Sequence, residues 1–293
     1  MNRRNFIRGC VFSALAGSVL LSQATKDNPL FSCSDEDPIL GYFEVHVADH
    51  CNLNCKNCCH FSSISDKHFY DLAQFNSDMA RLSEFTKGRV NDIRIMGGEP
   101  LLNPDINKYF DITRKYFKKS RIRVITNAIL LDRMDEDFWK NLSKNAVVIE
   151  VTLYKVNIDW KSILSKASKY GIEIIHYGKL VETFHNINLD LKGSMTNFMR
   201  CRECFCGGCY NLLDGKLYVC PIAAYVKYFN KAFNQNIKIS DGDYIDLYKA
   251  KNVSELWDWM KRPKPFCKYC GEPFDVPWET SNKHSIDEWT SIT

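Results

Sequence analysis

The sequence has no long hydrophobic run. Across its 293 residues no apolar stretch reaches the roughly 18 residues of a membrane-spanning helix, which excludes a protein with several spans. A basic stripe is also lacking. The net charge is +4, and Arg3, Arg4 and Arg8 supply three of the positive charges. Because the rest of the chain is nearly neutral, we expect no nucleic-acid partner.

Several common catalytic signatures are missing as well. The chain contains no P-loop, no Ser–His–Asp nucleophile elbow and no HExxH sequence, and it shows no internal repeat or low-complexity tract. Its composition, 45% hydrophobic and 25% charged, is that of an ordinary globular protein long enough to bury a core. A disordered or fibrous chain is therefore excluded.

Residues 1–35 differ from the rest and are set aside as a signal-like or extension segment. Residues 2–8 resemble a twin-arginine export signal, and a mildly apolar stretch follows at 11–21. The other interpretation is a basic extension of an intracellular enzyme. We expect a cytoplasmic protein, since the chemistry argued below needs a strong reductant. Export or membrane tethering through this segment is the alternative.

Strand and helix patterns alternate from residue 42 to residue 177. Helical spacing of apolar residues predicts helices over 71–86, 104–118, 133–144 and 159–169. Strands are predicted between and around them, over 42–48, 91–96, 121–126, 146–153 and 172–177. This alternation is typical of βα units on a parallel sheet, here a partial barrel of the α/β class. Active sites in such folds lie at the carboxyl ends of the strands.

The sequence is rich in cysteine, with 13 residues. Eleven of them form two crowded groups, at 51–59 and 201–220, and a pair at Cys267 and Cys270, while Cys10 and Cys33 stand apart. An odd number at close spacing disfavours a simple disulfide framework. Thiols grouped in this way are typical of metal ligands.

The first group has the spacing C-x3-C-x2-C and follows the first predicted strand. Cys51, Cys55 and Cys58 can hold three corners of a cubane iron–sulfur cluster and leave the fourth iron open to a ligand. The alternative is zinc, with Cys59, His60 or His50 as the fourth ligand.

These residues resemble the radical S-adenosylmethionine (SAM) superfamily. The resemblance rests on CNLNCKNC at 51–58 and on Gly-Gly-Glu-Pro at 97–100, after the second predicted strand. It covers about residues 40–178. One departure is Asn57, since the family commonly has an aromatic residue before the last cysteine. The paired glycines allow close approach to the backbone.

The resemblance implies a mechanism and a set of site residues. Cys51, Cys55 and Cys58 would bind a [4Fe–4S] cluster, and SAM would occupy the open iron. The segment Gly97, Gly98, Glu99 and Pro100 would receive the SAM amino group, and Asn127 would contact the cofactor. One electron, from a donor such as a flavodoxin or ferredoxin, would yield a 5′-deoxyadenosyl radical. The radical would abstract hydrogen from an unidentified substrate, either a peptide or protein or a small metabolite such as a carbohydrate.

The second cysteine group resembles an auxiliary-cluster module of the SPASM or twitch type. An Asp-Gly-Lys turn at 214–216 and a short strand precede Cys220, and the C-x2-C pair Cys267 and Cys270 lies downstream. The resemblance implies one auxiliary iron–sulfur cluster held by Cys220, Cys267, Cys270 and an earlier cysteine. The earlier ligand is left open, and the candidates are Cys201, Cys204, Cys206 and Cys209. A zinc ribbon is the alternative.

We therefore expect a partial (β/α)6-type radical SAM barrel over 36–195 and a small Cys-rich auxiliary-cluster module over 196–293. The aromatic residues near the last cysteines, including Trp259 and Trp278, are expected to pack this module and shield its cluster. The runner-up function is a non-catalytic iron–sulfur or zinc protein for metal binding or electron transfer.

Overall fold

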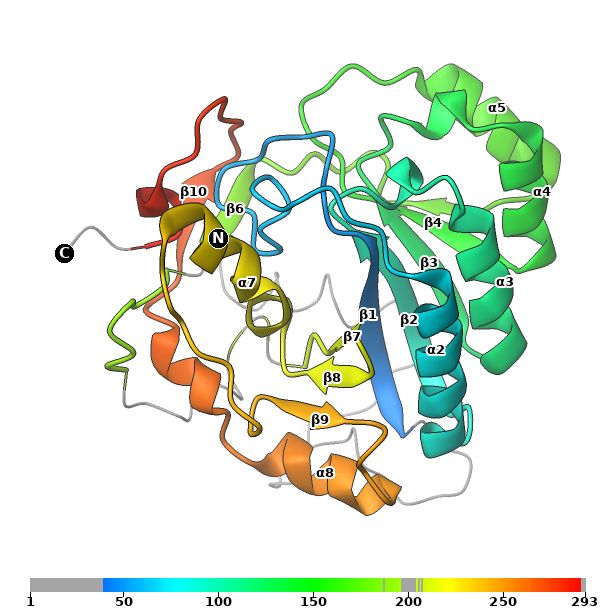
Figure 1. The fold of residues 1–293 in the computed structure, drawn as a ribbon. Helices are drawn as coiled ribbons and strands as arrows, with labels where there is room; N and C mark the ends of the chain where they lie inside the picture. Colours follow the sequence, from blue (N-terminus) through cyan, green and yellow to red (C-terminus); the bar gives the residue numbers. More distant parts are fainter. Residues whose placement is uncertain (1–38, 187, 196–203, 205, 207, 291–293) are drawn as a thin grey trace, which may run out of the picture.

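The computed structural model describes residues 39–186, 188–195, 204, 206 and 208–290 (Figure 1). The predicted extension over 1–35 and Cys201 therefore lie outside the described residues. None of the described helices is long and apolar enough to cross a membrane.

The first half of the chain forms alternating strands and helices, as predicted. The strands are β1 (Leu40–Ala48), β2 (Val90–Gly97), β3 (Arg121–Thr126), β4 (Val147–Val151) and β5 (Ile174–Ile175). Each pairs in parallel with the next. The helices between them are α2 (Leu72–Thr86), α3 (Ile106–Tyr116), α4 (Glu136–Lys144) and α5 (Trp160–Tyr170). The α/β class with a parallel sheet is thus confirmed.

The helix boundaries follow from capping. Asp71, Asp135 and Asp159 each accept a hydrogen bond from a backbone N–H in the first turn of α2, α4 and α5. The Asp135 cap also explains why α4 starts later than predicted: the preceding residues form a separate 3-10 turn, η2 (Leu131–Arg133). At the other end of α5, Gly171 has φ = 66° and ends the helix.

The two faces of the sheet have different partners. Helices α2–α5 cover one face (Figure 1), where alternate residues of β1 such as Phe43, Val45 and Val47 are fully buried in the hydrophobic core. The other face carries the alternate polar residues. Helix α7 (Pro221–Phe233) lies on that side, and its Tyr225 ring stacks on His46 of β1 with centroids 3.8 Å apart.

The C-terminal third continues the same sheet. Strand β7 (Asn211–Leu213) pairs in parallel with β1, and β8 (Lys216–Tyr218) and β9 (Tyr244–Asp246) add antiparallel strands, giving the order β5-β4-β3-β2-β1-β7-β8-β9. The hairpin predicted around the Asp-Gly-Lys turn is therefore present as β7–β8. The sheet runs across the predicted boundary near residue 195, so the division into two domains stays a prediction.

Several elements have no counterpart in the sequence prediction. Strand β6 (Thr183–Asn186) leaves the main sheet and pairs antiparallel with β10 (Phe274–Pro277). Consequently the sixth parallel strand of the described sheet is β7, which pairs with β1 on the side away from β2, and not the strand that follows β5. The remaining elements are α8 (Val253–Lys261) and three 3-10 turns, η1 (Pro100–Leu102), η3 (Pro265–Tyr269) and η4 (Ile286–Glu288).

Candidate functional site at the carboxyl ends of β1 and β2

The two sequence motifs meet at the carboxyl edge of the sheet. The cysteine loop, residues 51–58, follows β1, and residues 97–100 end β2 and enter η1. Backbone hydrogen bonds join residues 97–100 to the segment that leads from β1 into the loop: the N–H of Gly98 donates to Ala48 O at 2.9 Å, and the N–H of Glu99 donates to His50 O at 3.1 Å. The parallel register of β1 and β2 thus delivers both motifs to one place.

The paired glycines are required by the approach of the chain to itself. Gly97 has φ = 147°, and a Cβ there would lie 1.9 Å from Ala48 O. A Cβ on Gly98 would lie 2.3 Å from His50 O and 2.8 Å from Cys51 N. We expected the glycines to admit a ligand. The described contact is instead with the first residues of the cysteine loop, so the glycines set where that loop begins.

Glu99 is fully buried, and its carboxylate is held within the chain. Oε1 accepts hydrogen bonds from the Thr126 hydroxyl at 2.8 Å and the Leu101 N–H at 3.0 Å, and Oε2 accepts one from the Asn127 N–H at 2.9 Å. Burial raises the pKa of Glu99 to about 7, against the lowering effect of these donors. Its side chain therefore joins the end of β2 to the end of β3. An additional contact with a SAM amino group remains a prediction.

Asn127 lies beside the first cysteine of the loop. Its Nδ2 donates to Asn52 Oδ1 at 2.7 Å and lies 3.7 Å from Cys51 Sγ, while its Oδ1 accepts from the Ile129 N–H at 3.0 Å. The predicted cofactor contact of Asn127 is untested. Its side chain nonetheless links the end of β3 to the loop, as Glu99 links β3 to β2.

The three thiols of the loop are held out of water. Burial raises the pKa of Cys51 to about 12 and that of Cys55 to about 11, and it also raises the pKa of Cys58. They stay protonated unless a cation stabilises the thiolate. Nitrogen donors face two of the sulfurs: the Leu53 N–H at 3.4 Å from Cys51 Sγ and the Trp278 indole N–H at 3.2 Å from Cys55 Sγ.

These features fit an iron–sulfur cluster. Within the described ranges, no group of three or more His, Cys, Asp or Glu side chains is arranged to hold a metal ion. A cubane needs no such common point, because each thiolate binds a different iron. Near the loop, Nδ1 of His50 and Oγ of Ser63 are buried without a hydrogen-bond partner among the described residues. Buried polar atoms are normally paired, so this side of the loop suits a bound group.

The second cysteine group is also gathered by the fold. Cys206 is 3% exposed and Cys220 is 8% exposed. Contact with Cys204, contact with Cys209 and burial raise the pKa of Cys206, while burial and the neighbouring Cys270 raise that of Cys220. Sulfurs from residues 204–209, from the start of α7 and from the end of η3 thus lie near one another. Their role as auxiliary ligands remains a prediction.

Two cysteines of this group differ from the prediction in detail. The Tyr42 hydroxyl donates to Cys209 Sγ at 2.7 Å, which ties that thiol to β1. Cys267 is disulfide-bonded in the structure, and a disulfide sulfur is not a free thiolate ligand. A bound auxiliary cluster therefore requires the reduced form of Cys267.

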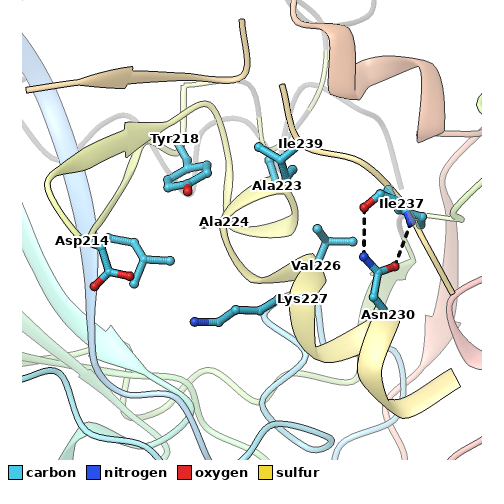
Figure 2. A pocket seen from close by; sticks show the side chains of 10 residues that line it. Asp214, Tyr218, Ala223, Ala224, Val226, Lys227, Asn230, Ile237 and Ile239 are labelled. Carbon is cyan, nitrogen blue, oxygen red and sulfur yellow. Dashed lines mark hydrogen bonds between the residues drawn. The ribbon is translucent and has the colours of Figure 1, made fainter. Parts of the chain in front are cut away.

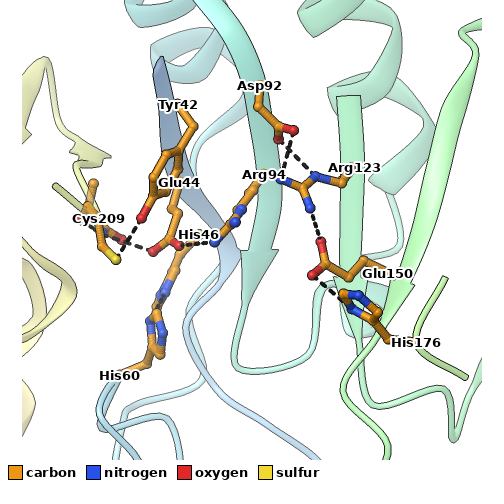
Figure 3. A network of polar contacts seen from close by, with 11 residues as sticks. Tyr42, Glu44, His46, His60, Asp92, Arg94, Arg123, Glu150, His176 and Cys209 are labelled. Atoms are coloured by element: carbon orange, nitrogen blue, oxygen red, sulfur yellow. Dashed lines mark hydrogen bonds and ion pairs between the residues drawn. The ribbon is translucent and has the colours of Figure 1, made fainter. Parts of the chain in front are cut away.

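A polar network covers the sheet face beside the cysteine loop (Figure 3). Arg94 on β2 pairs with Glu44 on β1 at 3.2 Å, and Arg123 on β3 pairs with Asp92 at 2.7 Å and with Glu150 on β4 at 2.6 Å. These side chains are mostly buried. The sequence prediction missed the network, although its signal was present: polar residues occupy alternate positions of successive strands.

The same face ends in a histidine pair next to the loop. Nε2 of His46 lies 2.7 Å from Nδ1 of His60, which follows the loop by two residues, and His46 is 2% exposed (Figure 3). The polar network and the cysteine loop therefore belong to one continuous polar region.

Two cavities occur elsewhere. One of about 210 Å³ lies between β8 and α7 and is lined partly by Asp214, Tyr218 and Lys227 (Figure 2). A larger one of about 500 Å³ lies between β9 and α8. Neither is lined by a cysteine or by residues 97–100, so they add nothing to the site at the strand ends.

Comparison with known proteins decides what this arrangement belongs to. Residues 45–173, somewhat less than half of the chain, match the model of the Radical SAM superfamily. This segment is a radical SAM domain. It contains the cysteine loop, residues 97–100 and Asn127, and it runs from β1 to the residue before β5. The radical SAM superfamily uses a [4Fe–4S] cluster and SAM, so the resemblance read from the two motifs is confirmed for this segment. Which residues hold the two cofactors stays a prediction.

Curated relatives of the radical SAM domain include GTP 3′,8-cyclases. The chain is 30% identical over 156 residues to that of Clostridium botulinum (strain Okra), covering 53% of this chain and 45% of the relative. It is 26% identical over 156 residues to that of Campylobacter jejuni subsp. doylei, covering 53% and 46%. The chain therefore aligns with less than half the length of the curated relatives it matches.

The chain is also similar to solved structures, at low identity and with TM-scores below 0.5. BtrN in complex with AdoMet and 2-DOIA is 18% identical with a TM-score of 0.49, over 80% of this chain and 94% of that one. anSMEcpe with bound AdoMet and the Cp18Cys peptide is 20% identical with a TM-score of 0.36, over 46% and 42%.

Proposed function

We propose that this protein is a radical SAM enzyme whose cluster is held by Cys51, Cys55 and Cys58. The observation that carries the proposal is the contact of residues 97–100 with the segment that leads from β1 into the cysteine loop, through the hydrogen bonds from Gly98 to Ala48 and from Glu99 to His50. The C-x3-C-x2-C spacing would supply three cluster thiolates, with the adjacent Cys59 not used, and would leave one iron open, which is the position that SAM requires.

Residues of the protein would position the bound cofactors and exclude water from this site. Cys51, Cys55 and Cys58 would hold the cluster, which would supply the electron for reductive cleavage of SAM and so the means to abstract hydrogen from the substrate. Residues 97–100 lie against the start of the loop and would adjoin the methionine part of SAM. Glu99 and Asn127 fix the ends of β2 and β3, and burial of the thiols keeps water from the sulfurs.

The substrate class is the finer part of the proposal. The sheet face beside the loop carries Glu44, Arg94, Arg123 and Glu150, which favours a polar substrate. A peptide and a small polar metabolite both satisfy this requirement. A neighbouring gene for a short precursor peptide would support the first, and sugar-biosynthesis genes would support the second.

We further propose that the second cysteine group binds one auxiliary iron–sulfur cluster. Its support is the proximity of Cys204, Cys206, Cys209, Cys220 and Cys270. The electron donor would be a flavodoxin or ferredoxin, and the site of action would be the cytoplasm.

Anaerobic reconstitution tests the main proposal. With iron, sulfide, SAM and dithionite, the protein should absorb near 400 nm and release 5′-deoxyadenosine. Cys58→Ala should lose about four irons per chain and all 5′-deoxyadenosine. Cys59→Ala, which changes the adjacent thiol, should keep both. Zinc in the triad, or a loaded cluster that never cleaves SAM, would instead make this a non-catalytic metal protein.

A further inference from the structure

The far end of the chain reaches the cysteine loop through one indole ring. The Nε1–H of Trp278 donates to Cys55 Sγ at 3.2 Å, across 223 residues of sequence. Cys55 is 6% exposed, so little water competes for this bond. We expected Trp278 to pack the C-terminal cysteines. The structure places its polar atom on the first group instead.

Two further contacts fix the orientation of this indole. Its ring stacks on Tyr154, with centroids 5.0 Å apart and planes inclined by 17°. Tyr154 follows β4, so it belongs to the same carboxyl edge as the cysteine loop. The backbone N–H of Trp278 donates to Glu182 O at 2.9 Å, next to the β6–β10 ladder. The donor is therefore held in place before any cofactor binds.

The residues after Trp278 bind the backbone of the loop. The Lys56 N–H donates to Glu279 O at 2.9 Å, and the Ser281 N–H donates to Asn54 O at 2.8 Å. The buried Trp289 indole donates to the Cys58 carbonyl at 3.0 Å. The Trp278 indole donates to a sulfur of the loop, whereas Glu279, Ser281 and Trp289 contact backbone atoms of the loop.

A hydrogen bond donated to a thiolate sulfur stabilises negative charge on the cluster that the thiolate binds. Reduction adds one electron, and part of the added negative charge resides on the ligand sulfurs. A hydrogen bond to such a sulfur stabilises the reduced state more than the oxidised one, and it raises the reduction potential. The backbone contacts of Glu279, Ser281 and Trp289 shape the loop without acting on this charge directly.

We infer that Trp278 is a positioning residue that acts through Cys55 and sets the reduction potential of the cluster bound by the 51/55/58 triad. The inference rests on the proposed function, since it requires that cluster. It assigns the C-terminal segment a role in electron uptake by the radical SAM domain, which neither the domain match nor the cysteine pattern includes.

The test compares two tryptophan variants in the anaerobically reconstituted full-length protein. Trp278→Phe removes the N–H and keeps an aromatic ring, and Trp289→Phe makes the same change at the carbonyl contact. The midpoint potential is followed by EPR, using the signal that changes when SAM is added, because only a cluster with an open iron responds to SAM. We expect Trp278→Phe to shift the potential to a more negative value, and Trp289→Phe to leave it near that of the unsubstituted protein.

Each outcome decides one question. An unchanged potential in a fully loaded Trp278→Phe protein, or equal shifts in both variants, would overturn the role of Trp278 and leave the proposed function intact. An unsubstituted protein that loads no cluster in the triad would end the proposed function itself.

A second measurement does not depend on the stability of the variant. In the unsubstituted protein labelled with 15N-indole tryptophan, pulsed EPR of the SAM-responsive reduced cluster should detect a 15N coupling. Trp289→Phe should retain that coupling. Its absence from the unsubstituted protein would contradict the hydrogen bond to Cys55.

Discussion

At the scale of single residues, Glu99 shows how burial changes the protonation of a carboxylate within a sequence motif. Its carboxylate has 0% exposure and is satisfied by donors from Thr126, Asn127 and Leu101. Burial outweighs the lowering effect of these hydrogen bonds and raises the pKa of Glu99 to about 7 from an ordinary value of 4.5. The protonated form is thus favoured in the folded protein, and the folded state binds more protons than the unfolded state between these two values.

This predicts a dependence of stability on pH. The contribution of Glu99 to the free energy of unfolding is fully present below pH 4.5. It declines as the pH rises towards 7, by on the order of 3 kcal/mol in total. Glu99→Gln should remove this decline, since the amide does not titrate. Urea unfolding of the metal-free protein between pH 4.5 and 8 measures it. Parallel pH curves for both proteins would contradict the assignment.

Gly98 offers a second test at this scale. An alanine Cβ there would lie 2.3 Å from His50 O, a backbone atom that moves only with the cysteine loop. Gly98→Ala should therefore cost roughly 2–3 kcal/mol of unfolding free energy and lower iron loading of the triad. Gly178→Ala is the matched control, because nothing lies within 4 Å of its Cβ. Equal melting temperatures for the two variants would show that the cysteine loop shifts to accommodate the added Cβ at little cost in stability.

At the scale of elements, a buried carboxylate on α2 holds the β7–β8 hairpin. Asp78 is fully buried and accepts hydrogen bonds from the Gly215 N–H at 2.7 Å, the Tyr248 hydroxyl at 2.6 Å and the Gln74 amide at 2.7 Å. Gly215 has φ = 71°, and a Cβ there would lie 2.4 Å from the Tyr248 ring. The turn predicted from Asp-Gly-Lys is thus also an anchoring point between distant segments.

Replacing this carboxylate tests the anchor. Asp78→Asn should lower the unfolding free energy by roughly 2–4 kcal/mol, because an amide nitrogen would face donors that need an acceptor. Asp66→Asn, in an exposed ion pair with Lys231, should be nearly neutral. Thermal melts of both variants measure the difference, and a neutral Asp78→Asn would show that the hairpin is held by other contacts.

The predicted elements differ in accuracy for physical reasons. Helix α2 and strand β3 were predicted to within a residue, because each is amphipathic and bounded by a cap or a turn. Strand β5 is only two residues long, and β6 pairs with a strand almost 90 residues later. Local periodicity carries no information about such a partner, so β6 was missed.

At the scale of the whole molecule, the sheet crosses the boundary expected near residue 195. Strand β7 covers the edge of β1, and Tyr225 of α7 covers His46. A fragment of residues 36–195 would expose that edge and that face. We expect it to aggregate, or to melt without a cooperative transition. Size-exclusion chromatography and circular dichroism measure this, with the full chain as the reference. A monomeric fragment with a sharp melt would support two independent domains.

The sequence by itself determined which chemical groups lie at the strand ends. Cys51, Cys55, Cys58 and residues 97–100 are local spacings, and the alternation of strands and helices fixes that they leave the same edge of a parallel sheet. Those properties depend on neighbours in the chain, so they can be read without the fold.

Tertiary structure alone decided what surrounds that chemistry. The indole of Trp278 on Cys55, the carboxylate of Glu99 bound to the end of β3, and β7 along β1 each join segments separated by tens to hundreds of residues. No local sequence pattern specifies such pairs, because many side chains in the sequence can donate a hydrogen bond or pack against another. Which of them come into contact depends on the path of the folded chain.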